Sequence, residues 1–243
     1  MDFLRKTRSF IRFYFDLSLD NKFTFVFTLL FPIAYLLITY SRVKSMNSNQ
    51  QMINLIGMIA YIIVDTALNC VTLRIFATRD SGYIKAYYFA SGSKWAIYWA
   101  NLIVQLLTVV LENLFFIIFS MILYGIFSIK LLILLVVLTI ITFPFVSLGF
   151  NFIFLLPFRE SSLSILSTTL LLGFLLIFTT TFPNNLNLLA LLNPYTLIGA
   201  LLKDMLAPSM VLTINIILVI LIYSFIGFVG YQFFDLQNRG RKN

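Results

Sequence analysis

The chain has no histidine, one cysteine and few charged residues, and each shortage excludes a class of protein. Without histidine there is no Ser-His-Asp triad, no haem held by histidine and no histidine metal site. Cys70 has no partner for an intrachain disulfide, so we expect a small buried filler there. Charged residues make up 11% of the 243 residues, whereas a soluble domain carries about 25%. Polar side chains therefore cannot cover a water-facing surface. A site built on Asp or Glu carboxylates remains possible.

Apolar residues fill most of the sequence, with 60% hydrophobic and 17% aromatic residues. A helical span needs about 20 apolar residues to cross about 30 Å of hydrocarbon, and backbone groups in lipid must be bonded within the segment. The sequence thus predicts an all-α membrane protein with six transmembrane helices and no separate soluble domain. The predicted spans are residues 23–40, 52–76, 96–124, 131–156, 163–182 and 210–234. Gly227 and Gly230 predict a close helix contact in the last span.

Basic residues are distributed unevenly over the predicted loops. With both termini in the cytoplasm, 13 of the 17 Lys and Arg residues lie inside, and Arg42, Lys44, Lys130 and Lys203 lie outside. Cytoplasmic loops carry an excess of Lys and Arg, and an even number of spans places both termini on one side. We therefore expect both termini to be cytoplasmic. The net charge of +8 then reflects topology and anionic lipid, and no nucleic-acid motif is found.

Residues 1–17 are too polar to span a membrane but have the pattern of an amphipathic helix. At 100° per residue their apolar side chains fall within about 140°, and Arg5, Arg8 and Arg12 fall within about 60° opposite. This pattern is typical of an interfacial helix with its basic face toward lipid headgroups. The helix would serve as a topology anchor or take part in gating. No short apolar core followed by small residues precedes Phe23, so we expect no cleaved signal peptide.

Residues 183–208, between the last two predicted spans, are apolar enough to enter the membrane but are broken by three prolines and an asparagine. Proline limits helix continuation and fixes turns. We therefore expect two short helices, at 186–192 and 195–206, folded into the outer leaflet as a re-entrant segment. Irregular backbone at that depth requires cover from other protein or a watery cavity.

Two rows of polar residues interrupt the second and third predicted spans. The members of each row fall within about 60° on a helix. Charged groups at bilayer depth are costly and face the bundle interior, so both rows should face protein or water. They either line a translocation path or a dimer seam, or only hydrogen-bond between helices. The rows are Asp65, Asn69 and Thr72 on the second span and Asn101, Gln105, Thr108 and Glu112 on the third.

Residues 77–97, between the second and third predicted spans, combine a charged start, a glycine, a short amphipathic helix and a basic exit. The stretch reads A-T-R-D-S-G-Y-I-K-A-Y-Y-F-A-S-G-S-K-W-A-I. It resembles the cytoplasmic coupling segment of ABC-2 type permeases, the membrane subunits of one class of ATP-driven exporters. In that family a charged pair precedes Ser-Gly and a basic residue follows, but a Thr-Pro turn is common where this chain has Ala90-Ser91-Gly92. The candidate ATPase-coupling residues are Arg79, Asp80, Ser81, Gly82, Tyr83 and Lys85.

A second segment, Leu192 to Lys203, is similar to the Asn-Pro signature that precedes the last span in the same family. Asn193 and Pro194 are candidates for an external gate. The resemblance implies two permease subunits, identical or similar, on two copies of an ABC ATPase. The chain has no G-x-x-x-x-G-K-S/T motif, so we expect no enzyme and no cofactor here, with ATP and Mg bound by the partner ATPase.

We expect the chain to export an amphipathic substrate across a bacterial cell membrane, and a peptide is the favoured substrate. The small size and short external loops resemble permeases for bacteriocins or phenol-soluble modulins. Permeases for polysaccharide, teichoic acid or drugs share the architecture. A rival from another class is a proton-coupled secondary transporter that uses Asp65 and Glu112. A membrane-embedded enzyme is disfavoured because nothing resembles a nucleophile with a base.

Overall fold

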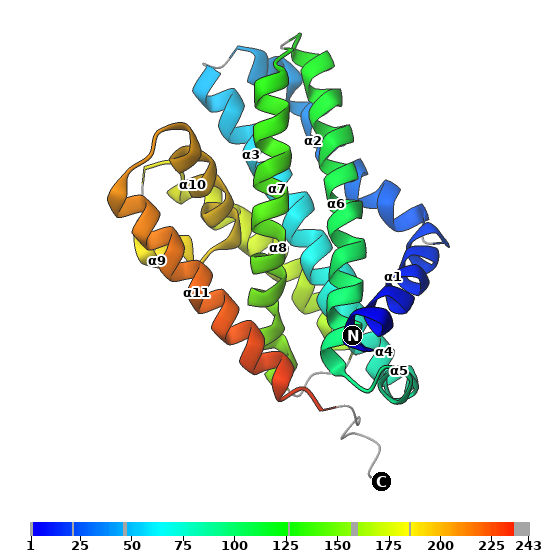
Figure 1. Ribbon diagram of the computed structural model, residues 1–243. Helices are drawn as coiled ribbons and strands as arrows, with labels where there is room; N and C mark the ends of the chain where they lie inside the picture. Colours follow the sequence, from blue (N-terminus) through cyan, green and yellow to red (C-terminus); the bar gives the residue numbers. More distant parts are fainter. Residues whose placement is uncertain are drawn as a thin grey trace.

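The computed structural model describes residues 2–20, 22–45, 48–125, 127–156, 160–184 and 186–235. All regular structure in these ranges is helical, which confirms the all-α class. Six of the helices are long and apolar enough to cross a membrane, so the chain is a multi-pass membrane protein (Figure 1). Four basic residues of the charge count lie outside the described residues: Arg159, Arg239, Arg241 and Lys242.

Helices are labelled in chain order, with η1 a π-helix and η2 a 3-10 helix. They are α1 (Asp2–Asp20), α2 (Lys22–Lys44), α3 (Ser48–Asp65), η1 (Thr66–Leu73), α4 (Arg74–Asp80), α5 (Tyr83–Ser91), α6 (Lys94–Tyr124), α7 (Ile129–Phe150), η2 (Asn151–Leu155), α8 (Glu160–Thr181), α9 (Leu188–Leu191), α10 (Pro194–Leu206) and α11 (Met210–Gln232).

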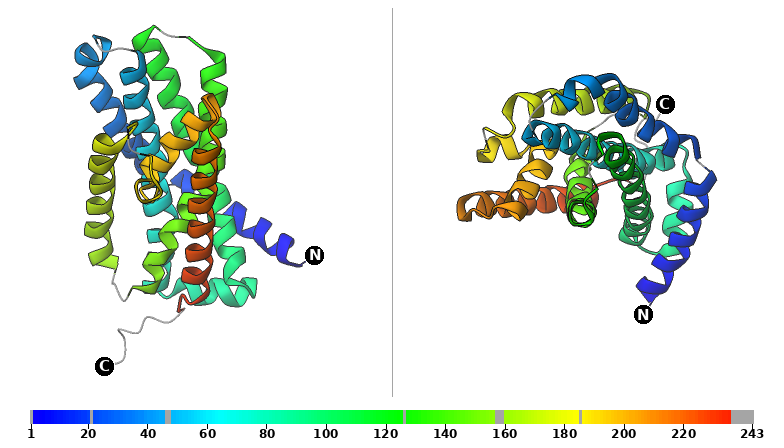
Figure 2. Two further views of the ribbon diagram at one scale, coloured as in Figure 1. Left: turned by 90° about the vertical axis from the view of Figure 1, so that its left-hand side faces the viewer. Right: turned by 90° about the horizontal axis from the view of Figure 1, so that it is seen from above.

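The second span, formed by α3, η1 and α4 together, is the centre of the bundle. Of its most apolar window 78% is buried, compared with 22% to 39% for the other five spans. Figure 2 shows α2 and α8 on one side of α3, with α7 and α11 on the other. A central helix in lipid must be apolar on every side, and α3 meets this condition with Ile59, Ile62 and Ile63 fully buried. This span runs on to Asp80, past the predicted end at residue 76.

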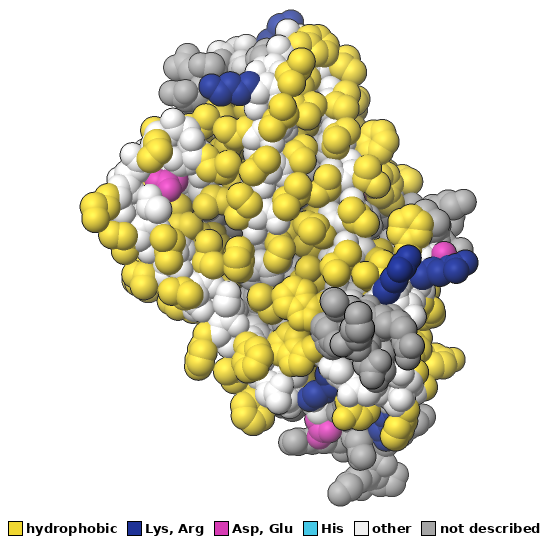
Figure 3. All heavy atoms as spheres, in the orientation of Figure 1, with side chains coloured by type: hydrophobic (Ala, Val, Ile, Leu, Met, Phe, Trp, Pro, Cys, Tyr) yellow, Lys and Arg dark blue, Asp and Glu magenta, His cyan; other side chains and the backbone are white. Residues whose placement is uncertain are grey.

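Large hydrophobic side chains cover the outer faces of the other spans. Phe115 and Ile122 on α6 and Phe225 on α11 are more than half exposed. Figure 3 shows such side chains over most of the visible face, with a few basic groups at its top, at its right edge and near its bottom. In water such a surface would drive aggregation, whereas lipid tails are as apolar as these side chains. The buried second span is therefore the central helix of the bundle. The exposed hydrophobic side chains of the other spans are suited to contact with lipid.

Two glycines allow α11 to pack closely on α7 and η2. A β-carbon at Gly227 would meet the backbone oxygen of Leu148, and one at Gly230 would meet that of Asn151. The predicted close contact is thereby confirmed. Asn151 also donates a hydrogen bond from Nδ2 to the Gly227 carbonyl over 3.4 Å. Small residues at such crossings let backbones approach and gain van der Waals contact.

The stretches outside the six spans are also helical. α1 leaves the bundle at a steep angle and lies along α6 (Figure 2). α9 and α10 occupy the region predicted to hold two short helices, and α10 packs against α3, α7 and α8. From Pro194 to Ala200 every side chain of α10 is buried. Protein therefore covers the first half of α10, whereas Leu189 on α9 and Leu206 at the end of α10 are exposed.

Candidate functional site

α5 is a short helix placed crosswise at one end of the bundle by two glycine turns. Gly82 precedes it with φ of 84° and Gly92 follows it with φ of 68°. This left-handed backbone is disfavoured for residues with a β-carbon. The N–H of Gly92 bonds to the Tyr88 carbonyl over 2.6 Å and ends the helix. The predicted coupling segment thus contains a helix that ends in a glycine cap.

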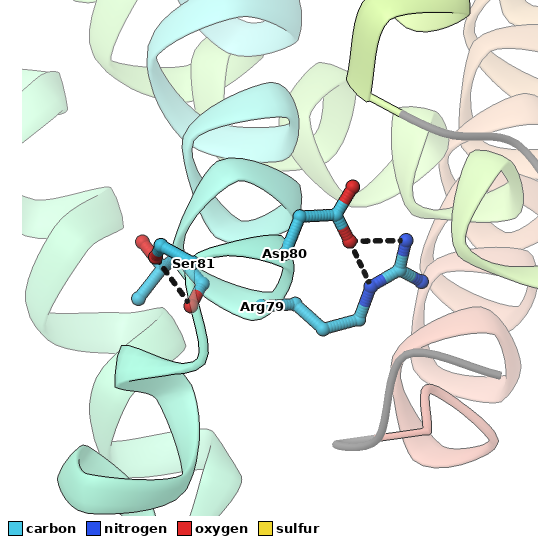
Figure 4. Close-up of polar contacts among 4 residues, drawn as sticks. Arg79, Asp80 and Ser81 are labelled. Carbon is cyan, nitrogen blue, oxygen red and sulfur yellow. Dashed lines mark hydrogen bonds and ion pairs between the residues drawn. The ribbon is translucent and has the colours of Figure 1, made fainter. Parts of the chain in front are cut away.

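The charged pair before this turn is held against the protein. Nε and Nη2 of Arg79 each lie 2.9 Å from Oδ1 of Asp80 (Figure 4). The guanidinium also lies over the ring of Phe76, 4.5 Å from its centroid, and over that of Phe234, 5.4 Å away. Ser81 points to the other side and donates to the Thr78 carbonyl. The pair therefore ties the end of α4 to the segment that follows α11.

The remaining coupling candidates, Tyr83 and Lys85, are exposed on different sides of α5. Ile84 is 1% exposed and anchors the helix to the core. Tyr83 is 63% exposed and Phe89 83% exposed, and Lys85 is exposed between them. Two large rings and a cation are thus largely exposed at the end of the bundle, with the Tyr83 ring stacked on that of Tyr87 and the Phe89 ring beside that of Tyr88. The sequence analysis did not include Phe89 among the coupling residues, because only its exposure in the fold, and not its spacing in the sequence, distinguishes it from neighbouring aromatic residues.

The other side of α5 contacts α1 through an aromatic cluster. The Tyr87 ring centroid lies 5.9 Å from that of Phe10 and 5.3 Å from that of Phe13. Tyr14 is 2% exposed and packs on Ile97 and other α6 residues. Burial raises the pKa of Tyr14, and burial followed by the nearby Tyr83 raises the pKa of Tyr87. Both phenols therefore stay neutral at physiological pH and support an apolar contact.

The polar row of the second span joins three helices. Asn69 donates from Nδ2 to Oδ1 of Asp65 over 2.6 Å, and Thr28 on α2 donates to Oδ2 over 3.3 Å. Ser167 on α8 donates to Oδ1 of Asn69 over 2.6 Å. Thr72 does not join them: it is fully buried and donates to the Ala67 carbonyl. The row divides because η1 is a π-helix, whose rotation per residue is smaller than the 100° assumed from the sequence.

The row of the third span meets the same π-helix from the other side. Asn101 donates from Nδ2 to the Cys70 carbonyl over 3.2 Å, and Thr66 donates to Oε2 of Glu112 over 3.1 Å. Gln105 is buried between them, whereas Thr108 lies within 3.5 Å of Ser18 on α1. A π-helix displaces the usual carbonyl partners, and Asn101 supplies one of the replacements. Cys70 itself is a buried free thiol, as predicted.

Some buried polar atoms of the described residues have no hydrogen-bond partner, and several lie on or beside the rows. They include Oδ1 of Asn101, Nε2 of Gln105 and Oδ1 of Asn113. Asn113 also donates to Thr139 on α7 over 3.1 Å, a contact the sequence analysis missed although Asn113 follows Glu112 directly. An unmade bond at a buried polar atom costs about 1–3 kcal/mol. The buried face of α6 thus has polar atoms that the described contacts leave without partners.

Asn193, which with Pro194 was predicted to form an external gate, caps the N-terminus of α10. Oδ1 of Asn193 accepts from the N–H of Tyr195 over 3.0 Å, and its Nδ2 donates to the Phe174 carbonyl on α8 over 2.8 Å. Pro194 occupies the first turn of α10, where its missing N–H costs nothing. Asn193 therefore both starts α10 and fastens it to α8.

Among the described residues, no three Cys, Asp or Glu side chains gather closely enough to hold a metal ion. Comparisons with protein-family models, with curated proteins and with solved structures give no match to this chain.

Proposed function

We propose that the chain is the membrane permease subunit of an ATP-driven exporter, working with a separate ATPase. The observation that carries this proposal is α5, a helix anchored by Ile84 that exposes Tyr83, Lys85 and Phe89 at the end of the bundle. Large aromatic side chains such as Tyr83 and Phe89 are enriched in surfaces that dock a partner protein. The complex would contain two permease subunits, identical or similar, and two copies of an ABC ATPase that bind ATP and Mg. Each ATPase would contact the α5 helix of one permease.

The contacts of α5 provide a route for movement into the membrane. Through the Gly82 turn α5 continues α4 and the central span, and through Gly92 it leads into α6. Tyr87 adds contact with α1. A partner that pushes on α5 therefore acts on the two spans that carry the polar rows, and on the helix beside them.

The proposed topology places α5 and both termini in the cytoplasm of a bacterial cell. Under this topology α1 lies at the inner interface with its basic face toward lipid headgroups, and α9 and α10 enter the outer leaflet as a re-entrant segment. The polar rows then line a path or seam, and the amide atoms of Asn101, Gln105 and Asn113 that lack a partner acquire one when the subunits move. The cargo is an amphipathic molecule, a peptide for preference.

The test is to purify the tagged chain from native membranes in a mild detergent. We expect a stoichiometric ATPase to accompany it, with ATP turnover that changes when candidate amphipathic peptides, glycans or drugs are added. The separately purified chain should hydrolyse no ATP and drive no flux in vesicles. Flux by the isolated chain without nucleotide would contradict the proposal.

A second candidate function is proton-coupled transport, favoured by two carboxylates in mid-span whose hydrogen-bond partners are neutral. Asp65 receives its bonds from Thr28 and Asn69, and Glu112 receives one from Thr66. Ionisable groups at such depth often carry protons in transporters. Here a protonophore would stop transport at once while ATP depletion would not, and the double change Asp65→Asn with Glu112→Gln would abolish it.

A further inference from the structure

An apolar cavity of about 180 Å³ lies between α3, α6 and α7, away from α5 and from the polar rows. Its inner wall is formed by Ile59, Ile117 and Leu135, whereas Gln51 and Tyr124 lie near the helix ends. Engineered apolar cavities of about 150 Å³ stay dry and take up hydrocarbons such as benzene. The cavity therefore suits a hydrocarbon and not a chain of waters.

The cavity extends from one end of the bundle into the membrane to about the depth of one leaflet. From Gln51 to Ile59 along α3 is about 12 Å at 1.5 Å per residue. Half of the hydrocarbon core measures about 15 Å. An acyl chain entering from the helix ends would therefore lie along the cavity with its headgroup outside, at the level of the α2–α3 and α6–α7 turns.

The mouth of the cavity is connected to a basic group through Tyr124, Tyr40 and Lys44. Tyr124 stacks on Tyr40, with ring centroids 6.0 Å apart. Lys44 donates to the Tyr40 hydroxyl over 3.1 Å and lies over its ring. Gln51, at the mouth itself, donates to the Val43 carbonyl over 3.1 Å. The end of α2 is thus held at the cavity opening.

The charge on the α2–α3 and α6–α7 turns has one sign. Arg42, Lys44 and Lys130 are exposed there, and the sequence has no Asp or Glu between residues 21 and 64 or between 113 and 159. Figure 3 shows basic groups at this upper end of the molecule. Each Lys or Arg near an anionic lipid surface is worth about fivefold in affinity, and Tyr is enriched at headgroup level.

We propose that this cavity binds part of one acyl chain of an anionic phospholipid from the surrounding bilayer, with the lipid phosphate at Lys44 and Arg42. The cavity supplies the hydrocarbon part of the recognition and the end of α2 supplies the charge. This lipid site does not depend on the proposed exporter function, because it lies at the other end of α6 from α5.

The test measures lipid retained by the purified full chain, using native mass spectrometry in detergent with added phosphatidylglycerol, phosphatidylcholine or oleate. The wild type should retain one phosphatidylglycerol, with at least fivefold preference over phosphatidylcholine. Met121→Trp, which fills the cavity, should abolish retention. The matched control is Ile122→Trp, the next residue of α6, which is 62% exposed on the outer face and should retain lipid. Leu55→Phe is a second filling variant if M121W fails to fold, as judged by helix content.

The charge is tested by Lys44→Gln, which should reduce the preference for phosphatidylglycerol about fivefold. Lys203→Gln, an exposed lysine on α10, should leave it unchanged. Equal retention of the two phospholipids, or retention by both folded filling variants, would overturn the proposal. Equal displacement of phosphatidylglycerol by oleate from the wild type and from K44Q would also overturn it, because the cavity would then bind hydrocarbon without a contribution from Lys44.

Discussion

At the scale of single residues, the bundle depends on backbones that approach one another and on polar groups that find partners in lipid. Gly230 is the clearest case of the first, because the oxygen of Asn151 occupies the place a β-carbon would take. Glu112 is the clearest case of the second, at 2% exposure with Thr66 as donor. Both can be tested with Cys70, whose buried thiol becomes reactive to a dye when the protein unfolds.

Gly230→Ala should lower the free energy of unfolding by about 1–3 kcal/mol, because α11 must move away from η2 to accommodate the methyl group. Thermal unfolding followed by dye labelling of Cys70 would measure this. The control is Gly173→Ala on α8, where a β-carbon meets no atom within 4 Å and the change should be neutral or stabilising. Equal melting of G230A and the wild type would contradict the close packing.

Glu112→Gln should leave both folding and ATP turnover of the purified complex nearly unchanged, within about twofold. The glutamine oxygen can accept the same bond from Thr66, so the contact between η1 and α6 is kept. The measurement is the ATPase rate of the complex, with the Cys70 melting curve as control for folding. A folded variant that has lost transport would instead favour the proton-coupled alternative.

At the scale of the elements, the end of α11 is capped by a residue from another helix. Nζ of Lys94, at the start of α6, donates to the carbonyls of Gln232 and Phe234 over 3.0 and 3.1 Å. Cations at helix C-termini are favourable because they meet the unpaired carbonyls and the negative end of the dipole. The cap joins the exit of α5 to the last span.

Lys94→Met keeps the apolar stem and removes the ammonium, so it should destabilise the protein by about 1 kcal/mol. The shift would be read from the thermal midpoint of Cys70 labelling. Lys85→Met on the exposed face of α5 is the matched control and should not shift it. An unchanged midpoint in K94M would show that water replaces the cap without cost.

The elements were predictable from the sequence to different degrees. The six spans and the helices at α1, α9 and α10 follow from apolar length, amphipathic spacing and proline positions, which are local properties. The π-helix η1 was not predictable, because it depends on partners such as Asn101 that lie on another helix. For the same reason the row from Asp65 to Thr72 divides between two faces. Tyr87 and Phe89 were both in the sequence, but only packing shows which of them contacts α1.

At the scale of the whole molecule, the proposed exporter function requires α5 and the α6–α7 turn to lie on opposite sides of the membrane. The two are separated by α6, whose 31 residues form one continuous helix. Its length of about 46 Å exceeds the hydrocarbon core of about 30 Å. From the distribution of the basic residues we propose that α5 lies on the cytoplasmic side.

In a Cys70→Ala background, Phe127→Cys should react with a membrane-impermeant maleimide in intact cells. Ser81→Cys should react only after permeabilisation, because it lies in the turn before α5. Both positions are exposed, so reactivity reports the side of the membrane. The reverse labelling pattern would place α5 outside the cell and out of reach of any ATPase.

The most direct measurement is site-specific photo-crosslinking in native membranes, with benzoylphenylalanine placed at Phe89 and, as the control, at Phe127. Both side chains are more than 70% exposed, at opposite ends of α6. We expect the Phe89 probe alone to give a cross-linked product that contains an ATP-binding subunit, and ATP binding to change its yield. A product of the same kind from Phe127, or no ATP-binding subunit at Phe89, would contradict the docking of an external ATPase on α5.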